Sequence, residues 1–143
     1  MKRVLIILLI LVLAFIWGNS CMNVADSRDE SSRVMDLLKP FLEIFVGKGN
    51  VTLHLVRKLA HFTEFAALGS ILALLLDFTW HGRAIGAVFG LLAGFLDETI
   101  QIFSGRGDQI SDVWLDFSGA VFGLLVFSLL RLLFVRLKSR RSR

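Results

Sequence analysis

The sequence predicts an all-α fold, an integral membrane four-helix bundle with an amphipathic interfacial helix between the first and second crossings. Of the 143 residues, 55% are hydrophobic, 13 are phenylalanine and one is proline. This composition is unusual for a soluble domain of this length, and the excess apolar surface indicates contact with lipid. Four apolar stretches are each close to the roughly 20 residues that span a bilayer. They are Val4–Met22, Leu59–Trp80, Ala84–Phe103 and Val113–Val135. The lipid bilayer is therefore the first expected partner.

The basic residues predict the orientation of the chain. Six of the 16 Lys and Arg residues lie at or beyond the end of the last apolar stretch, and Lys2 and Arg3 lie at the start. Positively charged ends stay cytoplasmic, so we expect both termini inside a bacterial plasma membrane that the chain crosses four times. Aromatic residues are not interleaved with these basic residues, which excludes nucleic acid as an expected partner.

Residues 1–22 are expected to form the first transmembrane helix. Their basic start and apolar run resemble a secretory signal, and Cys21 stands where a lipoprotein signal would be cleaved. The positions before Cys21 lack the aliphatic residue that such a cleavage site needs. The uncharged stretch from Val4 to Ala25 is also long enough to span a bilayer. We therefore expect an uncleaved anchor.

Residues 23–52 are expected to form an extracytoplasmic loop that contains an amphipathic helix. The spacing of Ser27 and Glu30 is that of a capping box and predicts a helix start after a solvated segment. From Ser32 to Val46, apolar residues recur at helical spacing opposite charged ones, with room for a bend at Pro40. This helix is too charged to span a bilayer, so we expect it to lie on the outer membrane surface or to cap the bundle.

Residues 53–135 are expected to form a three-helix membrane core, followed by a basic cytoplasmic tail at residues 136–143. The inner turn of this core is predicted at Trp80–Arg83, and the loop Ser104–Ser111 is predicted outside. Small residues let neighbouring helices approach closely. The glycines expected at helix contacts, inside one chain or between chains, are Gly86, Gly90, Gly94, Gly119 and Gly123.

Polar residues gather toward the outer end of all three core helices. Because a helix turns by about 100° per residue, Arg57, His61 and Glu64 share one face. A carboxylate facing lipid near the bilayer centre would cost about 3 kcal/mol, so we expect the polar groups to meet inside the bundle. The candidates for this network are Arg57, Lys58, His61, Glu64, Asp97, Glu98, Gln101, Arg106, Asp112 and Asp116.

The order and spacing of these residues carry a resemblance. The motifs are Arg57-Lys58-x-x-His61-Phe62-x-Glu64-Phe65-x-x-Leu68-Gly69, Asp97-Glu98-x-x-Gln101-x-Phe103, Arg106, and Asp112-Val113-x-x-Asp116-x-x-Gly119. Over about residues 53–130 the chain resembles the VanZ-like family of small bacterial membrane proteins. Members are associated with low-level resistance to the glycopeptide teicoplanin, so the resemblance implies a cell-envelope role. Asp116 stands where Asn is also common in that family.

Three functions are compatible with the polar residues. In the first, an outer pocket binds an envelope lipid, a wall precursor, the glycopeptide or a partner membrane protein. In the second, the protein is a membrane enzyme that acts on a lipid-linked phosphate. His61 would then be nucleophile or general acid and base, Lys58 and Arg106 would hold phosphate, and Glu64 or Asp97 would orient the histidine. The third is a small transporter, in which intramembrane acids couple to protons.

The sequence also allows a purely structural network, in which ion pairs fix the register of the helices. No metal or other cofactor is expected. A single well-placed histidine makes a zinc site unconvincing, and Arg57, Lys58 and Arg106 would compete with any cation for the carboxylates. The oligomeric state is left open.

Overall fold

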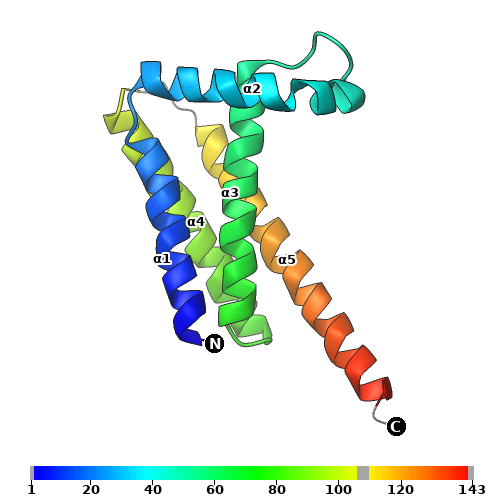
Figure 1. Ribbon diagram of the computed structural model, residues 1–143. Coiled ribbons are helices and arrows are strands. Elements are labelled where there is room, and N and C mark those ends of the chain that lie inside the picture. The colour runs from blue at the N-terminus through cyan, green and yellow to red at the C-terminus, as the bar shows by residue number, and fades with distance from the viewer. Residues whose placement is uncertain (1, 106–109, 142–143) are drawn as a thin grey trace.

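A computed structural model describes residues 2–105 and 110–141 (Figure 1). Within these ranges the chain forms five helices and no strand. The helices are α1 (Lys2–Ser20), α2 (Val24–Val46), α3 (Leu53–Leu75), α4 (Trp80–Phe103) and α5 (Ile110–Arg141). Four of them, α1, α3, α4 and α5, are long and apolar enough to cross a membrane. The predicted helical membrane bundle is confirmed.

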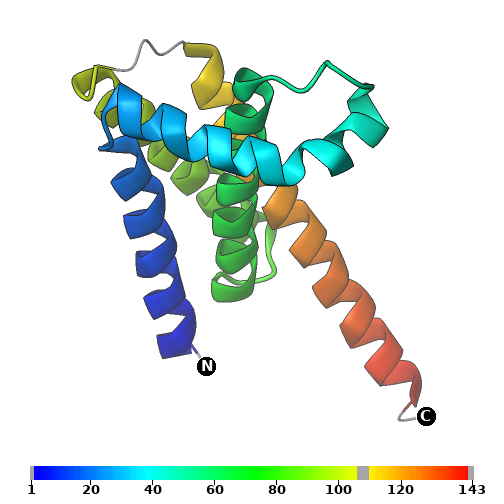
Figure 2. The same cartoon turned by 45° about the horizontal axis from the view of Figure 1, so that its top comes forward.

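The four long helices run between two ends of the molecule, and α2 lies across one of them (Figure 1). Figure 2 shows α2 passing over the ends of the other helices from a second direction. The start of α1 and the end of α5 lie at the opposite end, where the last part of α5 leaves the bundle. We call these two regions the α2 end and the terminal end.

The start of α2 differs from the sequence-based prediction. The helix begins at Val24, because the side chain of Asn23 caps it and accepts a hydrogen bond of 3.0 Å from the amide of Asp26. Ser27 and Glu30 therefore lie inside the helix, so the predicted loop and capping box are wrong, although most of the segment is exposed, as predicted. The helix continues through Pro40. Its location at a membrane surface stays a prediction.

The turn between α3 and α4 is also earlier than predicted. The hydroxyl of Thr79 accepts a hydrogen bond of 3.1 Å from the amide of Gly82, which caps α4. Trp80–Arg83 consequently forms the first turn of α4, and the chain reverses in residues 76–79. The prediction of an inner turn at Trp80–Arg83 is wrong, because the capping threonine lies immediately before it.

Close helix contacts in the middle of the bundle depend on glycine. A Cβ atom added at Gly90 would lie 2.7 Å from the Cβ of Ala120, so α4 and α5 meet there. A Cβ at Gly123 would collide with the carbonyl oxygen of Ala66 on α3. Each of the five glycines expected at helix contacts faces another helix of the same chain, namely Gly86, Gly90 and Gly94 toward α5 and Gly119 and Gly123 toward α3. This close approach brings the polar residues of three helices together at the α2 end.

Candidate functional site

A polar cluster lies inside the bundle near the α2 end. His61 of α3 stands between two aspartates, with Nδ1 3.6 Å from Oδ2 of Asp97 on α4 and 3.5 Å from Oδ1 of Asp116 on α5. Both aspartate side chains are fully buried, and the His61 side chain is 19% exposed. We define the buried cluster as Ser20, His61, Asp97, Glu98, Gln101 and Asp116. The structure thus joins residues from α1, α3, α4 and α5.

Hydrogen bonds hold the carboxylates of α4 in place. Ser20 Oγ donates to Asp97 Oδ1 over 2.6 Å. The side-chain Nε2 of Gln101 donates to Asp97 Oδ2 over 2.7 Å and to Glu98 Oε1 over 3.2 Å. Asp97 is therefore fixed from two sides, by its own helix and by α1.

The contribution of α1 is absent from the sequence-based prediction. Besides the hydrogen bond from Ser20 to Asp97, the side-chain Nδ2 of Asn19 donates to Glu64 Oε1 over 3.3 Å. The available signal was the polar pair Asn19-Ser20 at the end of an otherwise apolar helix. Polar side chains in a membrane helix commonly form hydrogen bonds with neighbouring helices, so this pair indicates a contact between α1 and the polar residues of the core.

The local sequence explains how α3 presents its polar face. Thr52 caps the helix by accepting a hydrogen bond of 3.2 Å from the amide of Leu55. Phe65 and Leu68 are completely buried against the other helices, which fixes the rotation of α3 about its axis. Across the bundle, Gly94 lies where a Cβ would be 3.0 Å from the Cβ of Asp116. The lack of a side chain there lets the aspartate of α5 approach α4.

Other predicted site residues lie around the cluster rather than in it. Lys58 Nζ is 3.4 Å from Asp112 Oδ1, and the two side chains are 36% and 26% exposed. This pair forms a rim on α3 and α5. Arg106 lies outside the described residues.

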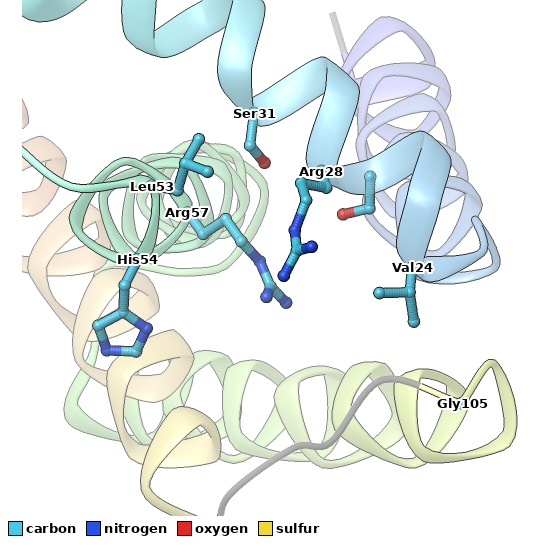
Figure 3. Close-up of a pocket in the computed structure, with 8 residues that line it drawn as sticks. Val24, Arg28, Ser31, Leu53, His54, Arg57 and Gly105 are labelled. Atoms are coloured by element: carbon cyan, nitrogen blue, oxygen red, sulfur yellow. The ribbon is translucent and has the colours of Figure 1, made fainter.

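Two hollows open beside the cluster. The arginine hollow, of about 370 Å³, is lined by Val24, Ser27, Arg28, Ser31, Leu53, His54, Arg57 and Gly105. The histidine hollow, of about 180 Å³, is lined by Arg57, His61 and Glu64 together with residues of α1 and α2. Arg57, Ser27 and Ser31 line both, so the hollows adjoin. Figure 3 shows Arg28 and Arg57 extending into the same space.

Arg28 and His54 are further site residues that the sequence-based analysis missed. Arg28 is exposed and falls in the segment that the sequence-based prediction places before the helix. Once α2 is seen to begin at Val24 and to cross α3, Arg28 faces the same hollow as Arg57. Only the packing of α2 against α3 brings these cations together.

The chain matches the protein-family model described as VanZ/LLP1 over residues 5–131. It belongs to the VanZ/LLP1 family. The match extends beyond the resemblance at residues 53–130 and includes most of α1, which supplies Ser20 and Asn19 to the site. No curated protein and no solved structure matches the chain. Family membership supports a VanZ-like envelope membrane protein.

In this VanZ/LLP1 chain the described motif residues include an inner set and the partly exposed rim of Lys58 and Asp112. His61, Asp97, Glu98, Gln101 and Asp116 form the inner set, which is rich in carboxylate oxygens and has one imidazole. Carboxylate and imidazole groups can bind a cation or exchange a proton. The arginines of the neighbouring hollow can instead hold an anion through charge-assisted hydrogen bonds.

Proposed function

We propose that this envelope membrane protein binds the phosphate-bearing headgroup of an envelope lipid or wall precursor in the arginine hollow. One observation carries the proposal: Arg28 of α2 and Arg57 of α3 line the same hollow. Among the described residues, neither guanidinium forms a hydrogen bond or ion pair. Two like charges that share a small space repel each other, and a phosphate between them would turn the repulsion into attraction.

The position of the hollow supports a lipid ligand. It lies at the α2 end, and α2 exposes several large apolar side chains, including Phe41, Ile44 and Phe45. An amphipathic helix with such a face binds at the boundary between headgroups and acyl chains. Under this proposal, α2 lies on the outer surface of a bacterial plasma membrane, and the hollow lies at headgroup depth. Binding would contribute to envelope homeostasis and to low-level teicoplanin resistance.

Native mass spectrometry of the detergent-solubilised protein tests the ligand class. Dioctanoyl phosphatidic acid and dioctanoylglycerol differ only in the phosphate, and we expect the first to bind at least about ten-fold more tightly, as charge-assisted hydrogen bonds predict. Farnesyl diphosphate, a soluble analogue of a wall-precursor carrier, distinguishes a polyprenyl source from a glycerolipid source. Equal binding of phosphatidic acid and dioctanoylglycerol would contradict the proposal.

Matched variants locate the binding site. Arg28→Gln and Arg57→Gln should each weaken phosphatidic acid binding by about ten-fold, because each removes a charged donor from the hollow. Arg33→Gln makes the same charge change elsewhere on α2 and should leave binding within about two-fold, as expected for a distant surface charge. A similar loss in all three variants would indicate general electrostatic attraction instead of a defined site.

The orientation can be tested separately. In a Cys21→Ser background, Lys48→Cys lies between α2 and α3, and Ser139→Cys lies near the end of α5. An impermeant maleimide applied to intact cells should label position 48 and not position 139. Labelling only at position 139 would place the α2 end inside and would contradict an outer-face site.

A second candidate function is favoured by the position of His61. Its side chain lines the histidine hollow that Arg57 also lines, while Nδ1 faces two buried carboxylates. A phosphate held by Arg57 would thus lie near an imidazole suited to general acid and base catalysis. Phosphate release from phosphatidic acid or farnesyl diphosphate, lost in His61→Gln, would favour the enzyme. Binding without turnover would favour the binding protein.

A further inference from the structure

We propose that the buried cluster binds a divalent transition-metal cation, Mn²⁺ or Zn²⁺, through His61, Asp97, Glu98 and Asp116. Each of these residues offers one ligand atom, and the four atoms lie within 4.8 Å of one another. They come from α3, α4 and α5, so the cation would tie three helices together. The inference goes beyond headgroup binding and does not depend on it.

The distances around His61 are those of a coordination shell. Nδ1 lies 3.6 Å from Asp97 Oδ2 and 3.5 Å from Asp116 Oδ1, which is too long for good hydrogen bonds. Two ligands at about 2.1–2.3 Å from one metal ion, at angles of about 90–110°, are about 3.0–3.8 Å apart. Both observed separations fall in this interval.

Asp116 supplies the independent sign of a ligand. Its side chain is fully buried, and neither carboxylate oxygen accepts a hydrogen bond from any group in the described part of the chain. Oδ1 nevertheless points toward His61. A buried carboxylate without hydrogen bonds is costly, and a bound cation would compensate both oxygens. The close contact with Gly94 keeps Asp116 at this position.

The surrounding hydrogen bonds resemble the support of a metal site. Ser20 and Gln101 donate to opposite oxygens of Asp97, and Gln101 also donates to Glu98. Such bonds orient ligating carboxylates in metalloproteins and affect metal affinity 10–100-fold. The histidine hollow, which His61 and Glu64 line, gives an entry path to the cluster.

The main objection from the sequence was competition by basic residues. Lys58 pairs with Asp112 on the rim, and Arg57 lines the two hollows without an ion pair to any described carboxylate. Arg106, the third of these basic residues, lies outside the described residues. The single histidine, which made a zinc site unconvincing from the sequence, is joined here by three carboxylates. Carboxylate oxygens bind both Zn²⁺ and Mn²⁺, whereas soft cations such as Cu⁺ prefer sulfur ligands. The proposal departs from the metal-free site expected from the sequence, and the oxygens of buried Asp116, which accept no hydrogen bond in the described part of the chain, are the reason.

Isothermal titration calorimetry of chelator-stripped protein in detergent, with MnCl₂ or ZnCl₂, tests the site. We expect saturable binding of one ion per chain, weakened at least about ten-fold in Asp116→Asn, since that change removes a charged ligand. Asp112→Asn makes the same chemical change one helical turn away and should bind within about two-fold of the wild type, as should Arg57→Gln, which disrupts only headgroup binding.

Electron paramagnetic resonance of the Mn²⁺-loaded protein identifies the ligand directly. Nitrogen hyperfine coupling should be present in the wild type and absent in His61→Gln. This readout decides the question even if Asp116→Asn fails to fold. Three outcomes would each overturn the proposal and leave a static ion-pair network. They are no saturable binding by the wild type, no nitrogen coupling in the Mn²⁺-loaded wild type, and equal losses in Asp112→Asn and Asp116→Asn.

Discussion

The two ends of the bundle hold their charged groups in opposite ways. At the α2 end, Asp97 and Asp116 are buried between helices and face His61. At the terminal end, Arg83 and Arg131 lie over the ring of Phe78, with their guanidinium carbons 4.4 and 5.9 Å from its centroid. Arg131 Nη1 also reaches the carbonyl oxygens of Ala73 and Leu76, at 3.5 and 3.4 Å.

The difference separates a structural use of charge from a functional one. The last carbonyls of a helix have no partner in that helix and carry partial negative charge. At the terminal end, Arg131 donates to the carbonyl of Ala73 in the last turn of α3 and to that of Leu76, which caps this helix. Backbone and aromatic groups thus provide its described partners. At the α2 end, carboxylates converge on one histidine beside two hollows. The charged groups of the α2 end therefore surround two hollows, whereas Arg131 at the terminal end contacts the C-terminus of α3.

The largest effect should come from the glycine contacts that connect the two ends. Gly123→Ala places a methyl group against the backbone carbonyl of Ala66, so α3 and α5 must move apart. We expect a loss of about 3 kcal/mol in the free energy of unfolding, at the upper end of the usual cost of overpacking. Titration with denaturing detergent, followed by circular dichroism, measures the loss.

Gly18→Ala is the matched control, because nothing lies within 4 Å of a Cβ at this position of α1. Alanine favours a helix over glycine by about 1 kcal/mol in soluble helices, so this variant should be neutral or slightly stabilising. An unchanged stability of Gly123→Ala would mean that α3 and α5 are not in the close contact that aligns the site.

A smaller effect should distinguish the two ends directly. Asp97→Ala leaves the Ser20 hydroxyl and the Gln101 amide without their shared acceptor, and we expect a cost of about 1–3 kcal/mol. Arg131→Ala removes only long hydrogen bonds and a distant ring contact at the terminal end. It should cost less than about 1 kcal/mol. Equal costs in the same detergent titration would show that the buried network contributes no more to stability than the contacts of Arg131 at the terminal end.

Much of the fold follows from simple features of the sequence. Apolar length predicted the four membrane helices, and helical periodicity placed His61 and Glu64 on one face of α3. The misplaced boundaries had a local cause. Asn23 and Thr79 cap the helices that follow them, whereas the predictions relied on a capping-box pattern and on the end of an apolar run.

The site was harder to predict because it depends on which helices lie beside each other. Spacing within a helix indicates a shared face, but it does not identify the partner of that face. Ser20 reaches Asp97 across a sequence separation of 77 residues, and Arg28 joins Arg57 only because α2 crosses α3. The sequence shows which residues are charged. Only the packing of the helices shows that they divide into a buried cluster, a rim and an arginine hollow.

The smallest effect is expected for the rim of the α2 end. Lys58→Met removes the ion pair with Asp112 while keeping most of the apolar length of the side chain. The pair is 3.4 Å long and partly exposed, so its loss should cost about 0–1 kcal/mol, and less at high salt. Thermal unfolding in detergent at low and high NaCl measures both. A cost similar to that of Asp97→Ala would show that the rim belongs to the buried network. A small, salt-sensitive cost would show that only the residues around His61 distinguish the α2 end from the terminal end in how charge contributes to stability.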